Sequence, residues 1–316
     1  MAPSRSSIRA RMTPRLFHAA AHTVAAMRMH TTPMIAILIV DGSSPSFFRK
    51  SSKTGPPSAS CGSKPLSRLE MSNDAAWPPA LRAAAELGCR RTLADPLDAA
   101  TDDGVDAVVV ASPTFTHAAV AEAALQAGKH VLCEKPLASS LEEAERIQAA
   151  ADGSSGALVM GFMRRFDAGF VRVAERIAAG DIGDPVFVRS TGRGPGLPPE
   201  WANDPRRSAG LIAEVNSHDL DTVRWLSTRE FERVYAAGRA AKRPDLAARY
   251  PGFVDLVAVT CELSEGGLAQ VDGACPADYG YDARVEVYGT EGVVMAGVAP
   301  NVTLVRRVNA GGFRAL

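Results

Sequence analysis

The 316-residue chain has no excess of charge of either sign, because 35 lysine and arginine residues balance 35 aspartate and glutamate residues. No global field therefore favours nucleic acid or an anionic membrane surface, and a small, weakly charged ligand fits better. The chain also lacks any apolar run approaching the roughly 18 residues that a membrane-spanning helix needs. We expect a soluble, cytoplasmic protein without nucleic-acid or membrane partners.

Several sequence patterns that would define other classes of protein are also missing. The five cysteines form no C-x-x-C pair and are too sparse for a disulfide scaffold or a zinc cluster, so we expect reduced thiols. The chain contains neither the G-x-x-x-x-G-K-[ST] phosphate loop nor a G-x-S-x-G nucleophile motif. These absences argue against P-loop nucleotide hydrolases and serine hydrolases.

The N-terminal segment lacks acidic residues. The first forty residues contain five arginines, several serines and threonines, and no aspartate or glutamate. This composition is typical of an organellar transit peptide, and the alternative is a disordered extension produced by a start codon placed too early, with Met34 as the true start. We interpret residues 1–33 as a leader or a disordered extension, so a mitochondrial or plastid location depends on the leader being real.

Short apolar strands that alternate with helices predict a doubly wound, Rossmann-like α/β domain with a parallel sheet over residues 34–161. Residues 41–73 interrupt the pattern, because seventeen of these thirty-three residues are Ser, Pro or Gly, and we expect irregular structure there. The expected strands are Ile35–Val40, Asp106–Ala111, His130–Cys133 and Ala157–Met160, and the expected helices are Trp77–Gly88, Thr116–Gln126 and Leu141–Ala151.

Residues 162–316 predict an α+β domain with a mostly antiparallel or mixed sheet. The glycine pattern Gly192-x-Gly194-x-Gly196 resembles a dinucleotide-binding loop. Pro198 and Pro199 follow it in place of a helix, so we expect a flexible loop. The expected helices are Phe170–Ala179 and His218–Leu226, and the expected strands are Pro185–Ser190, Phe231–Ala240, Val254–Leu263, Gly267–Ala274, Ala283–Tyr288 and Gly292–Met295.

Polar residues follow two neighbouring strands of the first domain. Glu134 and Lys135 come after His130–Cys133, and Ser112-Pro113-Thr114 with His117 comes after the preceding strand. Ligands bind at the carboxyl edge of open parallel sheets, so these side chains are candidates for a binding site. A surface ion pair of Lys135 with Glu134 is the alternative, as is a helix cap at Thr114.

A second group, Glu214 and His218, lies four residues apart just before or within a helix. At helical spacing a carboxylate can hold an imidazole in one tautomer, ready to accept a proton. The same spacing could present two metal ligands, but no third ligand is identifiable. A structural role, with Asp219 or Ser217 capping the helix and His218 only packed, is an equal alternative.

Five segments occur in the same order as in a known family. They are D-A-V-V-V-A-S-P-T-F-T-H (106–117), A-G-K-H-V-L-C-E-K-P (127–136), G-F-M-R-R-F-D (161–167), E-V-N-S-H-D-L-D-T-V-R-W-L (214–226) and V-E-V-Y-G-T-E-G (285–292). From about Asp74 to Gly297 the chain resembles the family of glucose-fructose oxidoreductase, inositol dehydrogenase and their relatives.

The resemblance implies a Rossmann domain that binds NAD or NADP, and a second domain whose sheet forms homo-oligomer contacts and one wall of the substrate site. The implied reaction is hydride transfer between nicotinamide and a carbinol carbon of a sugar, polyol or related small molecule. Lys135 and His218 match catalytic positions of the family. Substrate-binding positions match Glu214, Arg165 and Tyr281, and cofactor-binding positions match Ser112, Thr114, His117, Glu134, Lys135 and Asp74.

The chain departs from the family pattern at both ends. The family's first strand leads into G-x-G-x-x-G, which lets the backbone approach a pyrophosphate, whereas here Asp41-Gly42-Ser43-Ser44-Pro45 follows. The chain also stops at Leu316, where relatives usually continue. The alternatives are a catalytically silent relative acting as a binding or scaffold protein, or the product of a faulty gene model. A metal-dependent lyase or hydrolase comes third.

Overall fold

The computed structural model describes residues 37–40 and 91–297, and these form two compact units. The first contains the described residues up to Cys133 together with Glu145–Val159, and the second contains Glu134–Ala144 together with the described residues from Met160 onward. The segment 134–144 therefore belongs to the second unit, although it lies inside the span expected for the first domain.

Several sequence-based expectations fall outside the described residues. These are the leader at 1–33, the irregular segment at 41–73, the helix at Trp77–Gly88 and the candidate ribose ligand Asp74. Within the described part of the chain, no helix is long and apolar enough to cross a membrane.

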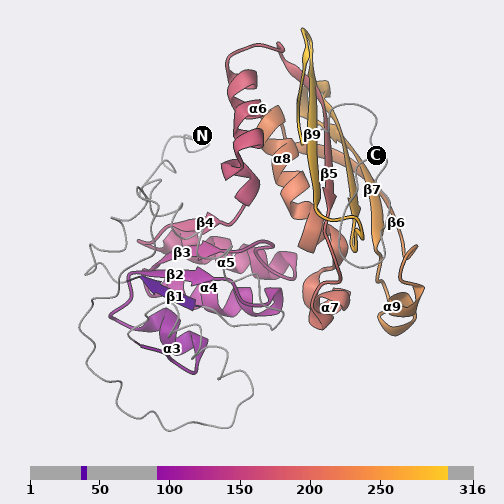
Figure 1. Ribbon diagram of the computed structural model, residues 1–316. Helices are drawn as coiled ribbons and strands as arrows, with labels where there is room; N and C mark the ends of the chain where they lie inside the picture. Colours follow the sequence, from indigo (N-terminus) through magenta and orange to yellow (C-terminus); the bar gives the residue numbers. More distant parts are fainter. Residues whose placement is uncertain (1–36, 41–90, 298–316) are drawn as a thin grey trace, which may run out of the picture. The chain divides into compact units, whose positions relative to one another are not determined.

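The first unit is built on a four-stranded sheet (Figure 1). Strands β2 and β3 are parallel, with Val108 opposite Val131, so the predicted strand–helix–strand crossover is confirmed for this part. The strands lie in the order β1 (Ile37–Val40), β2 (Ala107–Val110), β3 (His130–Cys133) and β4 (Leu158–Met160), and the helices are α3 (Pro96–Thr101), α4 (His117–Gln126) and α5 (Leu141–Gly153).

Strand β1 departs from the prediction of a parallel strand. It pairs with β2 in the antiparallel sense, with Ile37 opposite Val110 and Val40 opposite Ala107. An apolar run specifies burial but contains no information on direction, which is why the sequence pattern could not distinguish the two pairings. The carboxyl end of β1 consequently lies at the sheet edge opposite to the carboxyl ends of β2 and β3.

Helix α4 shows how local sequence fixes these elements. Its alanines at 118, 121 and 124 are almost fully buried, together with Leu125. The helix ends because Gly128 takes a positive φ of 74°, and its backbone N–H then donates to the carbonyl of Leu125 at 2.9 Å. A residue with a Cβ rarely adopts this conformation, so the predicted glycine stop is confirmed.

The second unit contains a mixed six-stranded sheet, in agreement with the predicted fold class. Helices α6 and α8 pack on one face of this sheet, where Phe170, Val173, Val223 and Leu226 join the buried side chains of the strands (Figure 1). The strand order is β10 (Val293–Ala296), β9 (Asp282–Gly289), β5 (Pro185–Arg193), β8 (Leu268–Ala274), β7 (Leu256–Leu263) and β6 (Phe231–Arg239), and only β5 and β8 among these pairs are parallel.

The helical segments of this unit differ from the sequence pattern in detail. Helix α6 (Ala168–Ala178) begins earlier than predicted, because Asp167 accepts hydrogen bonds from the N–H groups of Gly169 and Phe170 at 2.9 and 3.2 Å. Helix α8 (Ser217–Ser227) follows directly on a π-helical turn (Ile212–Asn216) that was not predicted. The short segments η2 (Met163–Phe166), η3 (Glu200–Asn203), α7 (Pro205–Ser208) and α9 (Pro244–Arg249) were also missed.

Candidate functional site

The loop after β2 places three predicted cofactor-binding residues at the carboxyl end of that strand. Ser112 Oγ lies 2.5 Å from Thr116 Oγ1, and His117 Nε2 donates to the Ser112 carbonyl at 2.8 Å. Thr114 and His117 are only 2% and 1% exposed. The buried imidazole of His117 therefore stabilises the loop through the Ser112 carbonyl. The contact between the hydroxyl groups of Ser112 and Thr116 joins the two ends of the same turn.

Lys135 belongs to the second unit, although it comes directly after β3 of the first. The Lys135–Pro136 peptide bond is cis. The Lys135 Nζ donates to the backbone carbonyl of Glu214, seventy-nine residues further along the chain. This contact brings together the two candidate segments that the sequence analysis identified separately, whereas an ion pair of Lys135 with Glu134 was the alternative.

The π-helical turn changes the relation between Glu214 and His218 that simple helical spacing implied. Glu214 lies inside the turn, whereas His218 is in the first turn of α8. Glu214 accepts a hydrogen bond from Lys135 through its main-chain carbonyl. A π-helical turn is rare and occurs often at functional sites, because it inserts one extra residue and redirects the side chains around it.

His218 is buried, with 5% of its surface exposed, and the ring of Phe162 lies edge-on to it with 6.4 Å between ring centroids. An imidazole at this depth is shielded from water. It is one helical turn from the carbonyl that holds Lys135. The second unit thus presents an ammonium group and an imidazole near one junction between the π-helical turn and α8.

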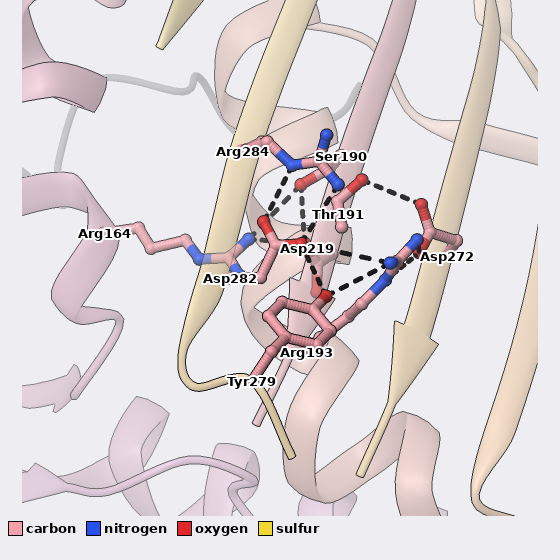
Figure 2. Close-up of polar contacts among 9 residues, drawn as sticks. All are labelled: Arg164, Ser190, Thr191, Arg193, Asp219, Asp272, Tyr279, Asp282 and Arg284. Carbon is pink, nitrogen blue, oxygen red and sulfur yellow. Dashed lines mark hydrogen bonds and ion pairs between the residues drawn. The ribbon is translucent and has the colours of Figure 1, made fainter. Parts of the chain in front are cut away.

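A buried polar network fixes this junction (Figure 2). The carboxylate of Asp219 is fully buried and accepts from Arg164 Nη1 at 2.5 Å, from Ser190 Oγ at 2.6 Å and from Asn216 Nδ2 at 2.9 Å. One alternative from the sequence was that Asp219 caps α8. The structure contradicts it, because the Asp219 carboxylate is used in these side-chain contacts. Its charge is compensated by Arg164, whose side chain is 3% exposed.

Two glycines make room for this network against the sheet. Gly192 of β5 and Gly273 of β8 are opposite one another in the parallel pair. A Cβ at Gly192 would lie 2.0 Å from Asp219 Oδ2, and a Cβ at Gly273 would lie 2.0 Å from Asn216 Oδ1. Gly192 was predicted to lie in a flexible loop, but it is part of a strand whose backbone closely approaches a buried carboxylate.

The remaining predicted substrate residues are found in more exposed surroundings. Arg165 forms two hydrogen bonds of 2.8 Å with the carboxylate of Asp221 and lies 5.5 Å from the ring centroid of Trp225. Its side chain is 41% exposed. Tyr281 is 56% exposed and immediately precedes β9. The structure therefore brings Arg165 to α8, next to the network, and leaves Tyr281 at the surface.

A second charged cluster connects β5, β8 and β9 with the loop before β9 (Figure 2). Arg193 Nε donates to Asp272 at 2.8 Å and Arg193 Nη1 to the Tyr279 hydroxyl at 3.2 Å. Tyr279 in turn donates to Asp282 at 2.7 Å, and Arg284 Nε donates to the same carboxylate at 2.7 Å. These bonds tie the ends of β5, β8 and β9 together.

Sequence reasoning missed Arg164 and Asn216, and it considered Asp219 as a helix cap and not as the partner of a buried arginine. A signal was available in the two consecutive arginines of G-F-M-R-R-F-D and the two aspartates of H-D-L-D, because charged residues inside apolar elements need partners. The structure pairs Arg164 with Asp219 and Arg165 with Asp221. No group of three histidine, cysteine or acidic side chains in the described part of the chain is arranged to hold a metal ion.

Comparison with protein-family models gives two matches. Residues 67–162 match the model described as an oxidoreductase family with an NAD-binding Rossmann fold, and residues 170–295 match the GFO/IDH/MocA C-terminal domain.

Among curated proteins, the chain is similar to myo-inositol 2-dehydrogenase of Thermotoga maritima, with 35% identity over 220 residues that cover 70% of this chain and 65% of the relative. It is also similar to inositol 2-dehydrogenase 2 of Saccharopolyspora erythraea, with 37% identity over 241 residues that cover 76% and 68%. The chain spans between 56% and 66% of the length of several other curated relatives that it matches.

Among solved structures, a probable dehydrogenase from Thermotoga maritima matches with a TM-score of 0.66 and 32% identity, covering 76% of this chain and 70% of that one. The scyllo-inositol dehydrogenase of Lactobacillus casei, solved with NAD(H) and scyllo-inositol, matches with a TM-score of 0.61 and 29% identity, covering 74% and 69%. Sequence and fold therefore agree on one family.

Proposed function

Because the chain belongs to the GFO/IDH/MocA family of oxidoreductases, we propose that it is an NAD-dependent dehydrogenase acting on a carbinol carbon of a polyol or sugar. One observation carries the proposal. The Lys135 ammonium group is held by the backbone of Glu214, one turn before the buried His218, within a single structural unit. The alternative of a surface ion pair does not account for this contact.

These two residues supply what alcohol oxidation requires of a protein. As the C–H electron pair leaves the carbinol carbon as hydride, the hydroxyl loses its proton and the carbon–oxygen bond becomes a carbonyl. His218 accepts that proton, since a neutral imidazole is the usual base near neutral pH. Lys135 donates a hydrogen bond to the same oxygen and stabilises the negative charge that develops on it.

The described residues of the first unit fit the nicotinamide end of the cofactor. The turn formed by Ser112, Thr114 and Thr116 lies at the carboxyl end of β2, the edge at which Rossmann domains receive their ligand. Bound NAD would supply the hydride acceptor. The positions that would meet the pyrophosphate and the ribose, Asp74 among them, lie in the part of the chain that the structure does not describe.

The test is a titration of the purified protein with NADH and NADPH, followed by protein fluorescence quenching and nicotinamide emission. We expect saturable binding in the micromolar range, with NADH favoured, and oxidation of inositols or related polyols with NAD. Lys135→Met and His218→Gln should each lower kcat by about 10² to 10⁴ while the melting temperature stays close to that of the parent protein. Lys129→Met, which changes a lysine of the first unit, is the matched control. Unchanged turnover in either site variant would return that residue to a structural role.

A second candidate is a catalytically silent family member that serves as a binding or scaffold protein. The antiparallel pairing of β1 with β2 favours it, because the carboxyl end of β1 then lies away from the edge where the glycine loop of a Rossmann fold meets the pyrophosphate. Absence of NADH and NADPH binding up to millimolar concentration would support this candidate.

We also propose that the protein forms a homo-oligomer through the outer face of the six-stranded sheet. The support is the alternation along the strands, in which every second residue packs on α6 and α8 and the others face away. The apolar side chains on the outward positions are 44% to 55% exposed and comprise Leu256, Leu268, Tyr288, Val293 and Met295. Leu268 and Tyr288 are both paired with Phe187, and Val293 is paired with Tyr288, so these side chains form an apolar patch at one end of the face, whereas Arg189 and Glu286 lie next to it. An exposed apolar patch with a charged rim is typical of a protein–protein interface.

A further inference from the structure

A pocket that is partly open to solvent is lined only by residues of the second unit, among them Glu214 of the π-helical turn. Residues from the segment around η3 and α7 form one side, and residues before β7 form the other. Its wall is mostly apolar and includes Pro198, Ala202, Leu211, Val215, Phe253 and Val254. The mechanism assigns no role to any of these side chains.

Cys275 also lines the pocket without adding a charge to it. Burial raises the pKa of its thiol above the ordinary value, an effect that Asp255 reinforces and Lys242 opposes. The thiol is therefore protonated at neutral pH and behaves as a small, weakly polar surface.

One polar group of the wall is still available for a ligand. Asn203 is 7% exposed and lines the pocket, and its Nδ2 donates to the carbonyl of Pro199 at 3.4 Å. This bond fixes the orientation of the amide, so the remaining atom is the acceptor Oδ1. Within the described part of the chain Oδ1 is buried and has no hydrogen-bond partner. Buried acceptors are normally satisfied, so this oxygen is suited to accept a hydrogen bond from a ligand.

Glu214 links the pocket to the candidate catalytic residues, because it lines the pocket and its carbonyl accepts a hydrogen bond from Lys135. We propose that the pocket receives the part of the substrate remote from the reacting carbon. That part is a hydrocarbon group, such as a deoxygenated ring edge or an alkyl substituent, next to one hydroxyl that donates to Asn203 Oδ1. The inference rests on the proposed dehydrogenase function and narrows its substrates to partly deoxygenated or alkyl-bearing polyols.

The wall chemistry discriminates between such a substrate and a fully hydroxylated one. Each hydroxyl moved from water onto an apolar wall loses its hydrogen bonds without replacement. Each methylene buried there instead gains roughly fourfold in affinity. Apart from Glu214, the side chains that line the pocket offer one oxygen acceptor, Asn203 Oδ1, so most hydroxyls of a fully hydroxylated ring would face apolar surface.

The experiment compares two six-membered carbocycles in the absence of nicotinamide. trans-Cyclohexane-1,2-diol retains two neighbouring hydroxyls and presents four methylenes, whereas myo-inositol is hydroxylated at every carbon. Titration followed by ligand-observed NMR should show the diol binding at least about tenfold more tightly. Asn203→Leu removes the acceptor and should weaken diol binding by about five- to tenfold. Gln148→Leu, the same kind of change on the exposed face of α5, should leave it unchanged.

Equal or tighter binding of myo-inositol would overturn the proposal, as would unchanged diol affinity in Asn203→Leu with a native melting temperature. Since the titration needs no hydride transfer, a protein that binds the diol but oxidises no polyol would contradict the proposed function and leave the pocket assignment standing. Turnover of fully hydroxylated polyols without preference for the diol would contradict the pocket assignment and leave the proposed dehydrogenase function standing. A third outcome is that neither ligand binds and that the protein forms a dimer which Phe253→Ser dissociates. This result would assign the pocket to a side chain of a second copy and would also overturn the proposal.

Discussion

Two arginines of η2 form ion pairs with two aspartates of α8, and the pairs differ in burial. We therefore expect their single-residue variants to differ in stability. Arg164 and Asp219 are 3% and 0% exposed, whereas Arg165 is 41% exposed in its pair with Asp221. Asp219→Asn leaves a buried guanidinium without its counter-charge and should lower the free energy of unfolding by about 3 to 5 kcal/mol. Asp221→Asn should cost only about 1 to 2 kcal/mol, because water can solvate Arg165.

Urea unfolding of both variants beside the parent protein measures this difference. The two aspartates are separated by one residue in the same helix, so each serves as the control for the other. Equal losses of stability would show that burial of the Arg164–Asp219 pair has no special cost.

The carboxylate of Asp282 gives a prediction for pH. Burial acts to raise the pKa of this group, but hydrogen bonds from Arg284 and Tyr279 outweigh it and hold the pKa below its ordinary value. A carboxylate whose folded-state pKa is lowered stabilises the protein above its unfolded pKa, and this contribution disappears as the pH falls through the folded-state pKa. Asp282→Asn should therefore lower the free energy of unfolding by about 1 kcal/mol at pH 7, and the difference from the parent protein should shrink below pH of about 4.

Denaturant unfolding at pH 7 and at pH of about 3.5 tests this, with the exposed Asp103→Asn as the control. A difference that is the same at both pH values would mean that the hydrogen bonds do not depend on the charge of Asp282.

At the scale of elements, the facing glycines of β5 and β8 determine how closely the π-helical turn and α8 approach the sheet. Gly273→Ala places a methyl group 2.0 Å from the present position of Asn216 Oδ1, so Asn216 must leave its bond with Asp219. We expect a loss of about 1 to 3 kcal/mol in stability. Because Glu214 and His218 flank Asn216, kcat should fall as well.

Gly153→Ala is the matched control, because nothing lies within 4 Å of the added Cβ and its stability should change little. Thermal unfolding and steady-state kinetics on both variants measure the two effects. If Gly273→Ala retained full stability and turnover, the glycine pair would not be what positions the turn.

The elements also show what the sequence could and could not predict. The buried strands β2 and β3, the Gly128 helix stop and the mixed second sheet follow from apolar runs, alternation and turn residues, which are local signals. The direction of β1, the π-helical turn and the extension of β5 through Gly192 depend on contacts between distant segments. For the same reason Lys135 and His218 could be proposed from their own motifs, whereas the Arg164–Asp219 pair, which joins distant segments, could not.

For the whole molecule, the outer face of the second sheet predicts association in solution. Leu268→Glu and Tyr288→Glu place charges in the apolar patch of this face and should shift the protein toward the monomer in analytical ultracentrifugation, without lowering its melting temperature. Leu141→Glu, which changes a 70% exposed leucine on α5, should leave the sedimentation unchanged. A parent protein that is monomeric at high micromolar concentration would contradict the proposal.

The passage of residues 134–144 into the second unit has a consequence for exchanging parts between family members. A chimaera joined at the single boundary near residue 160 would inherit its lysine segment from one parent and its π-helical turn from the other. The carbonyl of Glu214 would then meet a lysine loop selected alongside a different helix. A recombinant that keeps this pair intact needs three junctions, at 133/134, 144/145 and 159/160, so shuffling at one crossover separates residues that the fold treats as one part.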